Sequence, residues 1–329
     1  VGKQEETSVK KKTKRMLWSI GGVSVVLGGT LVAASYYLFT MAIARSTSNV
    51  DLYAGGGEAK EELENIAVLM ERGEQWLAQK EVERLEQQTY DGLTLYGRYI
   101  ANKDQTGKLA FLLHGYRGDS SEMGLAGKMY EEEGYDLFLP DARAHGESEG
   151  NYIGFGWLER QDQLNWLNQL IAEKELKQIV IHGESMGAST ALMVAGEKDL
   201  PKEVKVIIAD SPYTAVDEEL SHQMKNLFQI PSFPFLQMGS ALSKRIVGYT
   251  FKEASALEQV KNETPPLLFI HGSSDDLVPT YMSRELYNTA TTKEKEIWIA
   301  NGAGHVGAKL TEPPVYYKHV WSFVNRYIK

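Results

Sequence analysis

Residues 183–187, which read GESMG, place a serine in a setting typical of a catalytic nucleophile. The apolar stretch 178–185 precedes Ser185 and predicts a strand, and residues 186–197 predict a helix. A serine on a sharp turn between strand and helix has an exposed hydroxyl, and flanking glycines let neighbouring segments approach closely. The pattern therefore predicts Ser185 as a nucleophile in acyl transfer, with Gly183 and Gly187 shaping its turn.

A serine hydroxyl needs a base that accepts its proton. In strand–serine–helix enzymes of this kind the chain order is serine, acid, then histidine, and two histidines come late enough in this sequence. His305 lies in the glycine-containing loop 301–305, directly after the predicted strand 296–300. His319 lies in a predicted helix among aromatic residues, which favours a packing role. We therefore interpret His305 as the base.

The acid of such a triad holds the second imidazole nitrogen and sets its tautomer. Asp275 follows the predicted strand 266–272 and is the favoured candidate. Spacing alone does not exclude the adjacent Asp276, and Asp210 at the end of the predicted strand 204–211 is a third candidate. Carboxylates at strand ends often only cap turns, so these alternatives stay open on the residues themselves.

Acyl transfer also requires hydrogen-bond donors for the oxyanion that develops on the substrate. The amide of Met186, directly after the nucleophile, is one expected donor. The loop 114–118, which follows the predicted strand 109–115, is expected to supply the second through the amide of Tyr116.

The elements that must position these residues alternate along the chain. Short apolar strands are predicted at 109–115, 135–141, 178–185, 204–211, 266–272 and 296–300, with helices near 120–133, 156–172, 186–197, 280–291 and 312–328. Such alternation predicts a mostly parallel sheet with helices on both faces. Ligands bind beyond the carboxyl ends of such strands, where all of the candidate residues lie.

Three further segments flank or interrupt this pattern. Residues 212–264 are helical in pattern and rich in Phe and Met, and they predict a lid over the carboxyl edge of the sheet. Residues 88–100 predict a β-hairpin because they contain an Asp-Gly turn signal. Residues 45–87 are interpreted as a glycine-rich linker followed by amphipathic flanking helices, so that the catalytic domain is predicted to span 88–329.

The N-terminal part of the sequence predicts a membrane anchor. Residues 16–44 contain no charged residue and exceed the length of ~20 apolar residues that a spanning helix needs. The basic residues within 1–15 predict a cytoplasmic N-terminus, with the catalytic domain outside the cell membrane. A cleaved signal peptide ending at Ala44 is the alternative. Either interpretation exports the domain.

Taken together, these motifs resemble the α/β-hydrolase superfamily. The resemblance is carried by the motifs at 114–115, 141–148, 183–187, 271–279 and 304–305, and it covers roughly residues 88–329. More narrowly, the chain is similar to membrane-anchored hydrolases of Gram-positive bacteria. The resemblance implies the α/β-hydrolase fold and the triad, and it favours Asp275 over Asp276. One departure is Ala144, where relatives usually have glycine, and the loop around Arg143 and His145 is expected to brace the site.

Composition narrows the function further. The chain has 329 residues and no cysteine, which excludes disulfides and cysteine nucleophiles. Residues 1–45 contain seven of the 35 basic residues and two of the 44 acidic ones, so the remainder has 28 basic and 42 acidic residues. An acidic domain argues against a nucleic-acid partner. No metal-ligand motif or phosphate-binding loop is present, so no cofactor or metal is predicted.

We therefore expect a serine hydrolase that cleaves carboxylic esters with an apolar acyl part. A surface peptidase, amidase or acyltransferase is the nearest alternative, because the same groups attack amides and thioesters. A non-catalytic surface binding protein on the same scaffold is a third hypothesis. The fold does not by itself determine the substrate.

Overall fold

The computed structural model describes residues 28–46, 71–103, 106–226 and 229–329. Its centre is an eight-stranded sheet with the order β1-β2-β4-β3-β5-β6-β7-β8. The antiparallel strands are β1 (Glu83–Gln88) and β2 (Thr94–Ile100); the parallel strands are β3 (Lys108–Leu113), β4 (Asp136–Pro140), β5 (Gln178–Glu184), β6 (Val204–Asp210), β7 (Leu267–Gly272) and β8 (Lys295–Ala300). The predicted mostly parallel sheet is confirmed.

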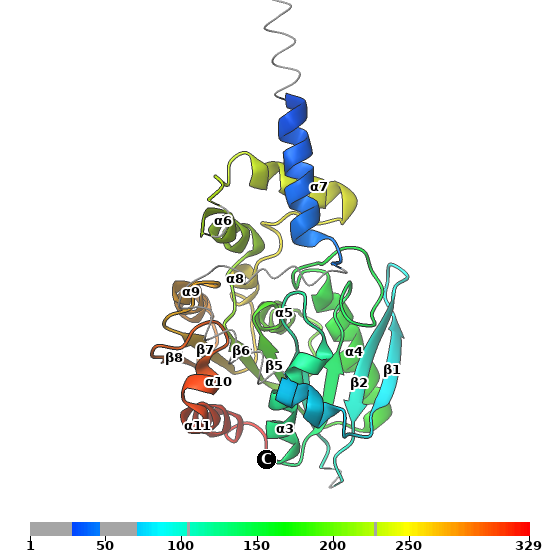
Figure 1. Ribbon diagram of the computed structural model, residues 1–329. Helices are drawn as coiled ribbons and strands as arrows, with labels where there is room; N and C mark the ends of the chain where they lie inside the picture. Colours follow the sequence, from blue (N-terminus) through cyan, green and yellow to red (C-terminus); the bar gives the residue numbers. More distant parts are fainter. Residues whose placement is uncertain (1–27, 47–70, 104–105, 227–228) are drawn as a thin grey trace, which may run out of the picture.

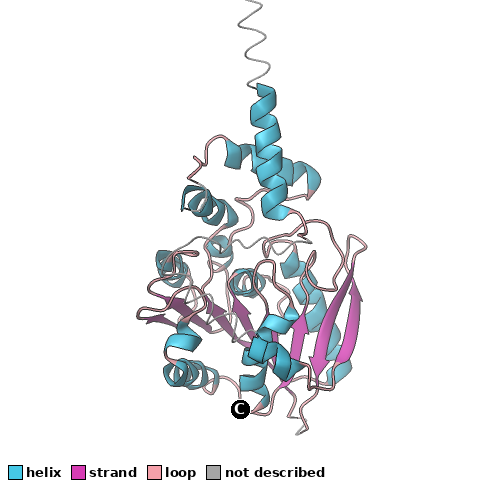
Figure 2. Ribbon diagram, viewed as in Figure 1, coloured by secondary structure: helices cyan, strands magenta, loops and turns pink. Residues whose placement is uncertain are grey.

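Helices cover both faces of this sheet (Figure 2), as two separate hydrophobic clusters show. One cluster contains residues of α4 (Glu159–Lys174), α5 (Met186–Ala195), α8 (Ala256–Gln259) and α9 (Thr280–Thr289). The other contains residues of α3 (Gly124–Glu131), α10 (Ala308–Thr311) and α11 (Pro313–Val324), next to the short 3-10 helix Ser120–Met123. The central strands are buried on both sides, which explains why their sequences are almost continuously apolar.

The hairpin predicted at 88–100 is present, but the sheet begins earlier than the predicted domain boundary. Strand β1 pairs antiparallel with β2, from Glu83 opposite Tyr99 to Gln88 opposite Thr94. Only Leu85 and Gln87 of β1 are buried. An edge strand with one apolar residue carries almost no periodic signal, so sequence analysis placed this segment with the linker and flanking helices.

The excursion between β6 and β7 contains α6 (Val216–Asn226), α7 (Phe235–Ile246) and α8. Helices α6 and α7 lie beyond the carboxyl edge of the sheet, in the position expected of a lid (Figure 1). Helix α8 differs, since Ala256 and Val260 are part of the hydrophobic core against α5 and α9. The predicted lid at 212–264 therefore ends in a segment that belongs to the core.

Residues 28–43 form a helix that stands beside α7 at the same end of the molecule (Figure 1). Residues 16–27 of the predicted anchor and residues 47–70 lie outside the described residues. Among the residues that the structure describes, no helix has the length and apolar character required to span a bilayer.

Candidate active site

Ser185 occupies a strained turn between β5 and α5. Its φ is 55° and its ψ is −117°, a conformation that is uncommon for a residue with a side chain. A Cβ atom at Gly183 would overlap the carbonyl of Gly187, and one at Gly187 would overlap the carbonyl of Leu113. Both positions therefore require glycine, as the GESMG pattern predicts. The tight turn holds the Ser185 side chain at the carboxyl edge of the sheet.

Ser185, His305 and Asp275 come together from three distant parts of the chain. The Nε2 atom of His305 lies 2.8 Å from Oγ of Ser185, and its Nδ1 atom lies 2.8 Å from Oδ2 of Asp275. The other carboxylate oxygen of Asp275 accepts hydrogen bonds from the amides of Leu277 and Val278 at 3.1 and 2.8 Å. One imidazole thus bridges a hydroxyl and a carboxylate that is itself held in place.

The alternative candidates lie elsewhere. Asp276 is exposed, and its carbonyl rather than its carboxylate is near a histidine, His222. Asp210 is buried and accepts a hydrogen bond from the Tyr316 hydroxyl at 3.1 Å. His319 stacks on the Trp298 ring with a centroid distance of 4.6 Å. The Asp210 and His319 side chains thus have contacts of their own, and the imidazole that reaches Ser185 is bonded to Asp275.

The environment of the imidazole suits it to act as a base. Burial lowers the pKa of His305, but the neighbouring Asp275 carboxylate outweighs this effect and raises the pKa above its ordinary value of 6.5. Burial by itself raises the pKa of the Asp275 carboxyl. The interactions of this carboxyl with His305 and His271 outweigh burial and bring its pKa below the usual range. Asp275 is therefore ionised over the physiological range and would stabilise a protonated imidazole, as a base that accepts a serine proton requires.

The loop after β3, residues 114–118, lies close to Ser185, and we call it the oxyanion loop after its predicted role. A Cβ atom at Gly115 would lie 3.6 Å from Cβ of Ser185, so the backbone of this loop runs alongside the reacting hydroxyl. The Tyr116 ring stacks on Phe155, with centroids 5.1 Å apart. Met186 is the first residue of α5, where helix amides have no acceptor within their own helix. Tyr116 and Met186 line the same pocket as Ser185, and the role of their amides as oxyanion donors stays a prediction.

Two buried histidines join this loop to the loop after β4. Nε2 of His145 accepts a hydrogen bond from the amide of Arg117 at 3.0 Å. Nε2 of His114 accepts one from the amide of Ala142, also at 3.0 Å. Burial lowers the pKa of both imidazoles, to about 3 for His145, so both stay neutral and keep an acceptor nitrogen. This agrees with the bracing role expected for the loop that contains His145.

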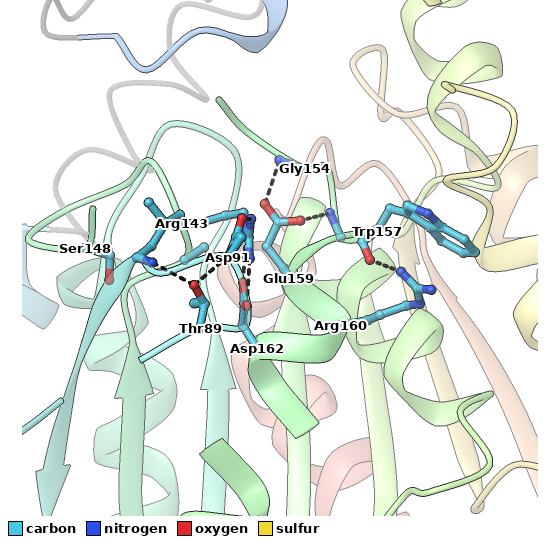
Figure 3. A network of polar contacts seen from close by, with 12 residues as sticks. Thr89, Asp91, Arg143, Ser148, Gly154, Trp157, Glu159, Arg160 and Asp162 are labelled. Carbon is cyan, nitrogen blue, oxygen red and sulfur yellow. Dashed lines mark hydrogen bonds and ion pairs between the residues drawn. The ribbon is translucent and has the colours of Figure 1, made fainter. Parts of the chain in front are cut away.

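Arg143, Asp91 and Asp162 form a second polar group at the same edge of the sheet, which we call the Arg143 cluster (Figure 3). The guanidinium Nε atom donates to Asp162 at 2.8 Å and Nη1 donates to Asp91 at 2.9 Å. The side chains of Arg143 and Asp162 are 2% and 0% exposed, so this ion pair is desolvated. Next in the chain, Ala144 has a φ of 61°, a left-handed conformation that glycine adopts more readily than alanine.

Glu159, the first residue of α4, extends this polar region toward the site. Its two carboxylate oxygens accept hydrogen bonds from the amides of Gly154 and Gly156, at 2.7 and 2.8 Å (Figure 3). These two bonds hold the residue between them, Phe155, against Tyr116. The polar network on the β2 and β4 side therefore fixes one wall of the space next to Ser185.

An apolar pocket opens beside Ser185 and Met186. Its lining comes from the helix 28–43, the oxyanion loop, the loop before α4, the lid and the loop after β7. Besides Ser185 and Met186, the lining residues are Leu38, Phe39, Met41, Ala42, Tyr116, Phe155, Tyr213, Glu219, Leu220, Gln223, Met224, Phe235, Leu236, Gly239, Phe251, Leu277 and Val278. Glu219 is the one ionisable carboxyl among these, and burial raises its pKa to about 7. The pocket can hold an apolar group attached to a carbonyl that Ser185 attacks.

Sequence analysis did not identify several of these pocket residues. Phe155 and Glu219 lie in a loop and in a lid helix whose positions no motif specifies. Residues 38–42 belong to an apolar run that resembles a membrane span, and the run contains no signal that distinguishes protein contact from lipid contact. Within the described residues, no group of three or more His, Asp or Glu side chains is arranged to hold a metal ion.

The fold and the arrangement around Ser185 are those of an α/β-hydrolase of the serine type. A sequence model of the prolyl oligopeptidase family matches residues 155–329, which is more than half of the chain. The protein therefore belongs to the prolyl oligopeptidase family of α/β-hydrolases.

Individual relatives include proteins with and without a described activity. The uncharacterized protein YqkD of Bacillus subtilis is 30% identical over 236 residues, covering 71% of this chain and 76% of YqkD. The lysophosphatidylserine lipase ABHD12 of Rattus norvegicus is 28% identical over 181 residues, covering 54% of this chain and 43% of the lipase. The structure of the Pyrococcus furiosus esterase Pf2001 matches with a TM-score of 0.63 and 26% identity, covering 76% of this chain and 92% of the esterase.

Proposed function

We propose that this protein cleaves carboxylic esters through an acyl-enzyme formed on Ser185. The hydrogen-bonded series Ser185–His305–Asp275, with both distances at 2.8 Å, is the observation that carries this proposal. His305 takes the hydroxyl proton as Ser185 Oγ attacks the carbonyl carbon, and then delivers that proton to the departing alkoxide. Water, deprotonated by the same imidazole, hydrolyses the acyl-enzyme and releases the acid.

The surroundings of Ser185 support an ester with an apolar acyl part. Almost all of the pocket lining is aliphatic or aromatic, which favours burial of a hydrocarbon chain at about 25 cal/mol per Å² of apolar surface. The relatives named as an esterase and a lysophospholipid lipase are consistent with this choice. The amides of Tyr116 and Met186 would stabilise the oxyanion, a contribution of about 3 kcal/mol for each donor.

Peptide or amide cleavage is the second candidate function, and the match to the prolyl oligopeptidase family favours it.

We also propose that the apolar residues 16–44 attach the protein to the cell membrane, with the catalytic domain outside. The exposed apolar side chains of the described part of that segment, Val32, Tyr36 and Tyr37, support this attachment.

The full chain, purified in detergent, should be assayed against p-nitrophenyl esters and aminoacyl p-nitroanilides. We expect kcat/KM for the esters to exceed that for the anilides, and both activities to disappear in Ser185→Ala. Dominant anilide turnover would replace the esterase proposal with the peptidase one. A fluorophosphonate probe should label the wild type and not Ser185→Ala; a folded, unlabelled wild type would favour a binding protein.

A further inference from the structure

The helix 28–43 packs on the hydrolase domain along one face. Ser35, Phe39 and Ile43, at a spacing of four residues, are at most 2% exposed, whereas Tyr37, on the opposite side of the helix, is 63% exposed. Residues four apart lie on one side of a helix. A helix whose only function is to hold a domain near a membrane has no need for such a buried face.

The end of this helix is bonded to the loop that runs beside the nucleophile. The Tyr116 hydroxyl donates to the carbonyl of Ala42 at 2.6 Å, and the Arg117 guanidinium donates to the carbonyl of Met41. The last carbonyls of a helix have no partner within it, so side chains from the oxyanion loop satisfy them here. The helix end and the oxyanion loop are therefore held together.

Residues 146–153 also bond to the same end of the helix. The amide of Arg45 donates to the carbonyl of Asn151, and the amide of Ile153 donates to the carbonyl of Ile43, both at 2.8 Å. The Arg45 guanidinium also donates to the carbonyls of Ser148 and Gly146. Helix 28–43 is thus attached to the domain immediately before residue 47, where the described part of this segment ends.

The side chains of the last turns close the pocket beside Ser185. Leu38, Phe39, Met41 and Ala42 line it, opposite residues of the lid helices α6 and α7. One turn earlier, Ser35 Oγ lies 3.4 Å from the sulfur of Met238 in α7. The pocket therefore has one wall from the lid and another from the segment that the sequence predicts to be an anchor.

We propose that residues 38–42 form the acyl-binding wall and determine which acyl chains the enzyme accepts, favouring medium or long chains over acetate. This inference rests on the proposed ester hydrolysis at Ser185. A short acyl group contacts only the residues next to Ser185, whereas a longer chain extends between the lid and the N-terminal helix. Cleavage after Ala44 would remove this wall, so the working enzyme retains the segment.

Leu38 is the position for testing the wall, because its side chain lines the pocket and is only partly buried. Full-length wild type and Leu38→Trp, in the same detergent, should be compared on p-nitrophenyl acetate, butyrate, octanoate and dodecanoate. We expect Leu38→Trp to lower the ratio of dodecanoate to acetate kcat/KM by about tenfold or more, since a misfit of one or two methylenes has effects of this size. Leu38→Ala should give a ratio of dodecanoate to acetate kcat/KM at least as high as that of the wild type.

Tyr37→Trp is the matched control, because it adds bulk on the exposed face of the same turn. Its chain-length profile should run parallel to that of the wild type. A Leu38→Trp profile parallel to the wild type would overturn the proposed wall, and so would an active enzyme whose intact mass shows cleavage after Ala44. A far-UV circular dichroism spectrum and a denaturation midpoint matched to the wild type show that Leu38→Trp is folded.

The experiment separates failure of this inference from failure of the proposed function. If the wild type hydrolyses no ester, the esterase proposal fails. The wall is then tested by labelling rates of fluorophosphonates with short and long alkyl chains, which require only a reactive serine. Leu38→Trp should slow labelling by the long-chain probe by about tenfold relative to the short one, and equal labelling ratios in both proteins would contradict the wall.

Discussion

Two buried polar groups lie at the carboxyl edge of this sheet, and they differ in whether their basic member can change its protonation within the ordinary pH range. In the Arg143 cluster a permanent cation is paired with Asp162 and Asp91, at 2.8 and 2.9 Å. In the triad, the imidazole of His305 lies between a carboxylate and a neutral hydroxyl. Its protonation can change within the ordinary pH range, while that of Arg143 cannot.

The comparison shows how the surroundings separate reactive from structural groups. Burial lowers the pKa of Arg143, but its hydrogen bonds to Asp162 outweigh this and raise it, so the cluster is a constant ion pair. The Asp275 carboxylate raises the pKa of His305 above its ordinary value of 6.5, and the imidazole is hydrogen-bonded to the Ser185 hydroxyl. A buried charge pair with no titratable member near pH 7 is suited to bracing the site, whereas a titratable imidazole next to a hydroxyl is suited to the proton transfer that we propose.

The largest effect is expected for His305→Ala. Removing the base should lower kcat by about four orders of magnitude, because Ser185 loses the acceptor for its proton. The free energy of unfolding should change little, since the imidazole bonds mainly to Asp275 and Ser185 and packs little core. Ester hydrolysis and denaturant unfolding measured on the same preparation check both parts. A loss of activity below tenfold would show that the base is another residue.

Arg143→Met, in contrast, should lower the free energy of unfolding more than it lowers kcat. It leaves the buried Asp162 carboxylate without its cation, and breaking a buried pair in this way costs about 3–5 kcal/mol of stability. Asp91→Asn is the matched control, because the Asp91 side chain is 38% exposed and a partly solvated partner contributes about 1 kcal/mol or less. Denaturation midpoints test this ranking. If Asp91→Asn were as destabilising as Arg143→Met, the distinction between the buried and the exposed partner would be wrong.

The smallest expected effect is a displacement of the pH profile. Catalysis needs neutral His305, so kcat/KM should fall as the pH decreases through the pKa of this imidazole. Because the Asp275 charge outweighs burial, the midpoint of this acid limb should lie above 6.5. Asp275→Asn removes that charge and should move the midpoint downward, besides lowering the rate. A wild-type midpoint below 6.5 would mean that the carboxylate does not dominate the imidazole's environment.

Sequence analysis was most successful where function depends on local geometry. The GESMG turn requires glycine on both sides of Ser185 for steric reasons that act within five residues, and the apolar strands predict a sheet buried on both faces. The choice among Asp275, Asp276 and Asp210 could not be made in this way. The choice depends on which carboxylate the loop containing His305 reaches in the folded protein. That loop packs against Gly272, where a Cβ atom would overlap the carbonyl of Ala303.

The sequence by itself determined the order of the elements, the strained turn at Ser185 and the positions of the residues that meet at the sheet edge, because short-range sterics and hydrophobic periodicity encode them. Tertiary structure alone decided that β1 joins the sheet, that Asp210 bonds to Tyr316, and that Leu38, Phe39, Met41 and Ala42 line the pocket. An apolar side chain is compatible equally with lipid and with a protein interior, so its partner depends on how distant segments pack.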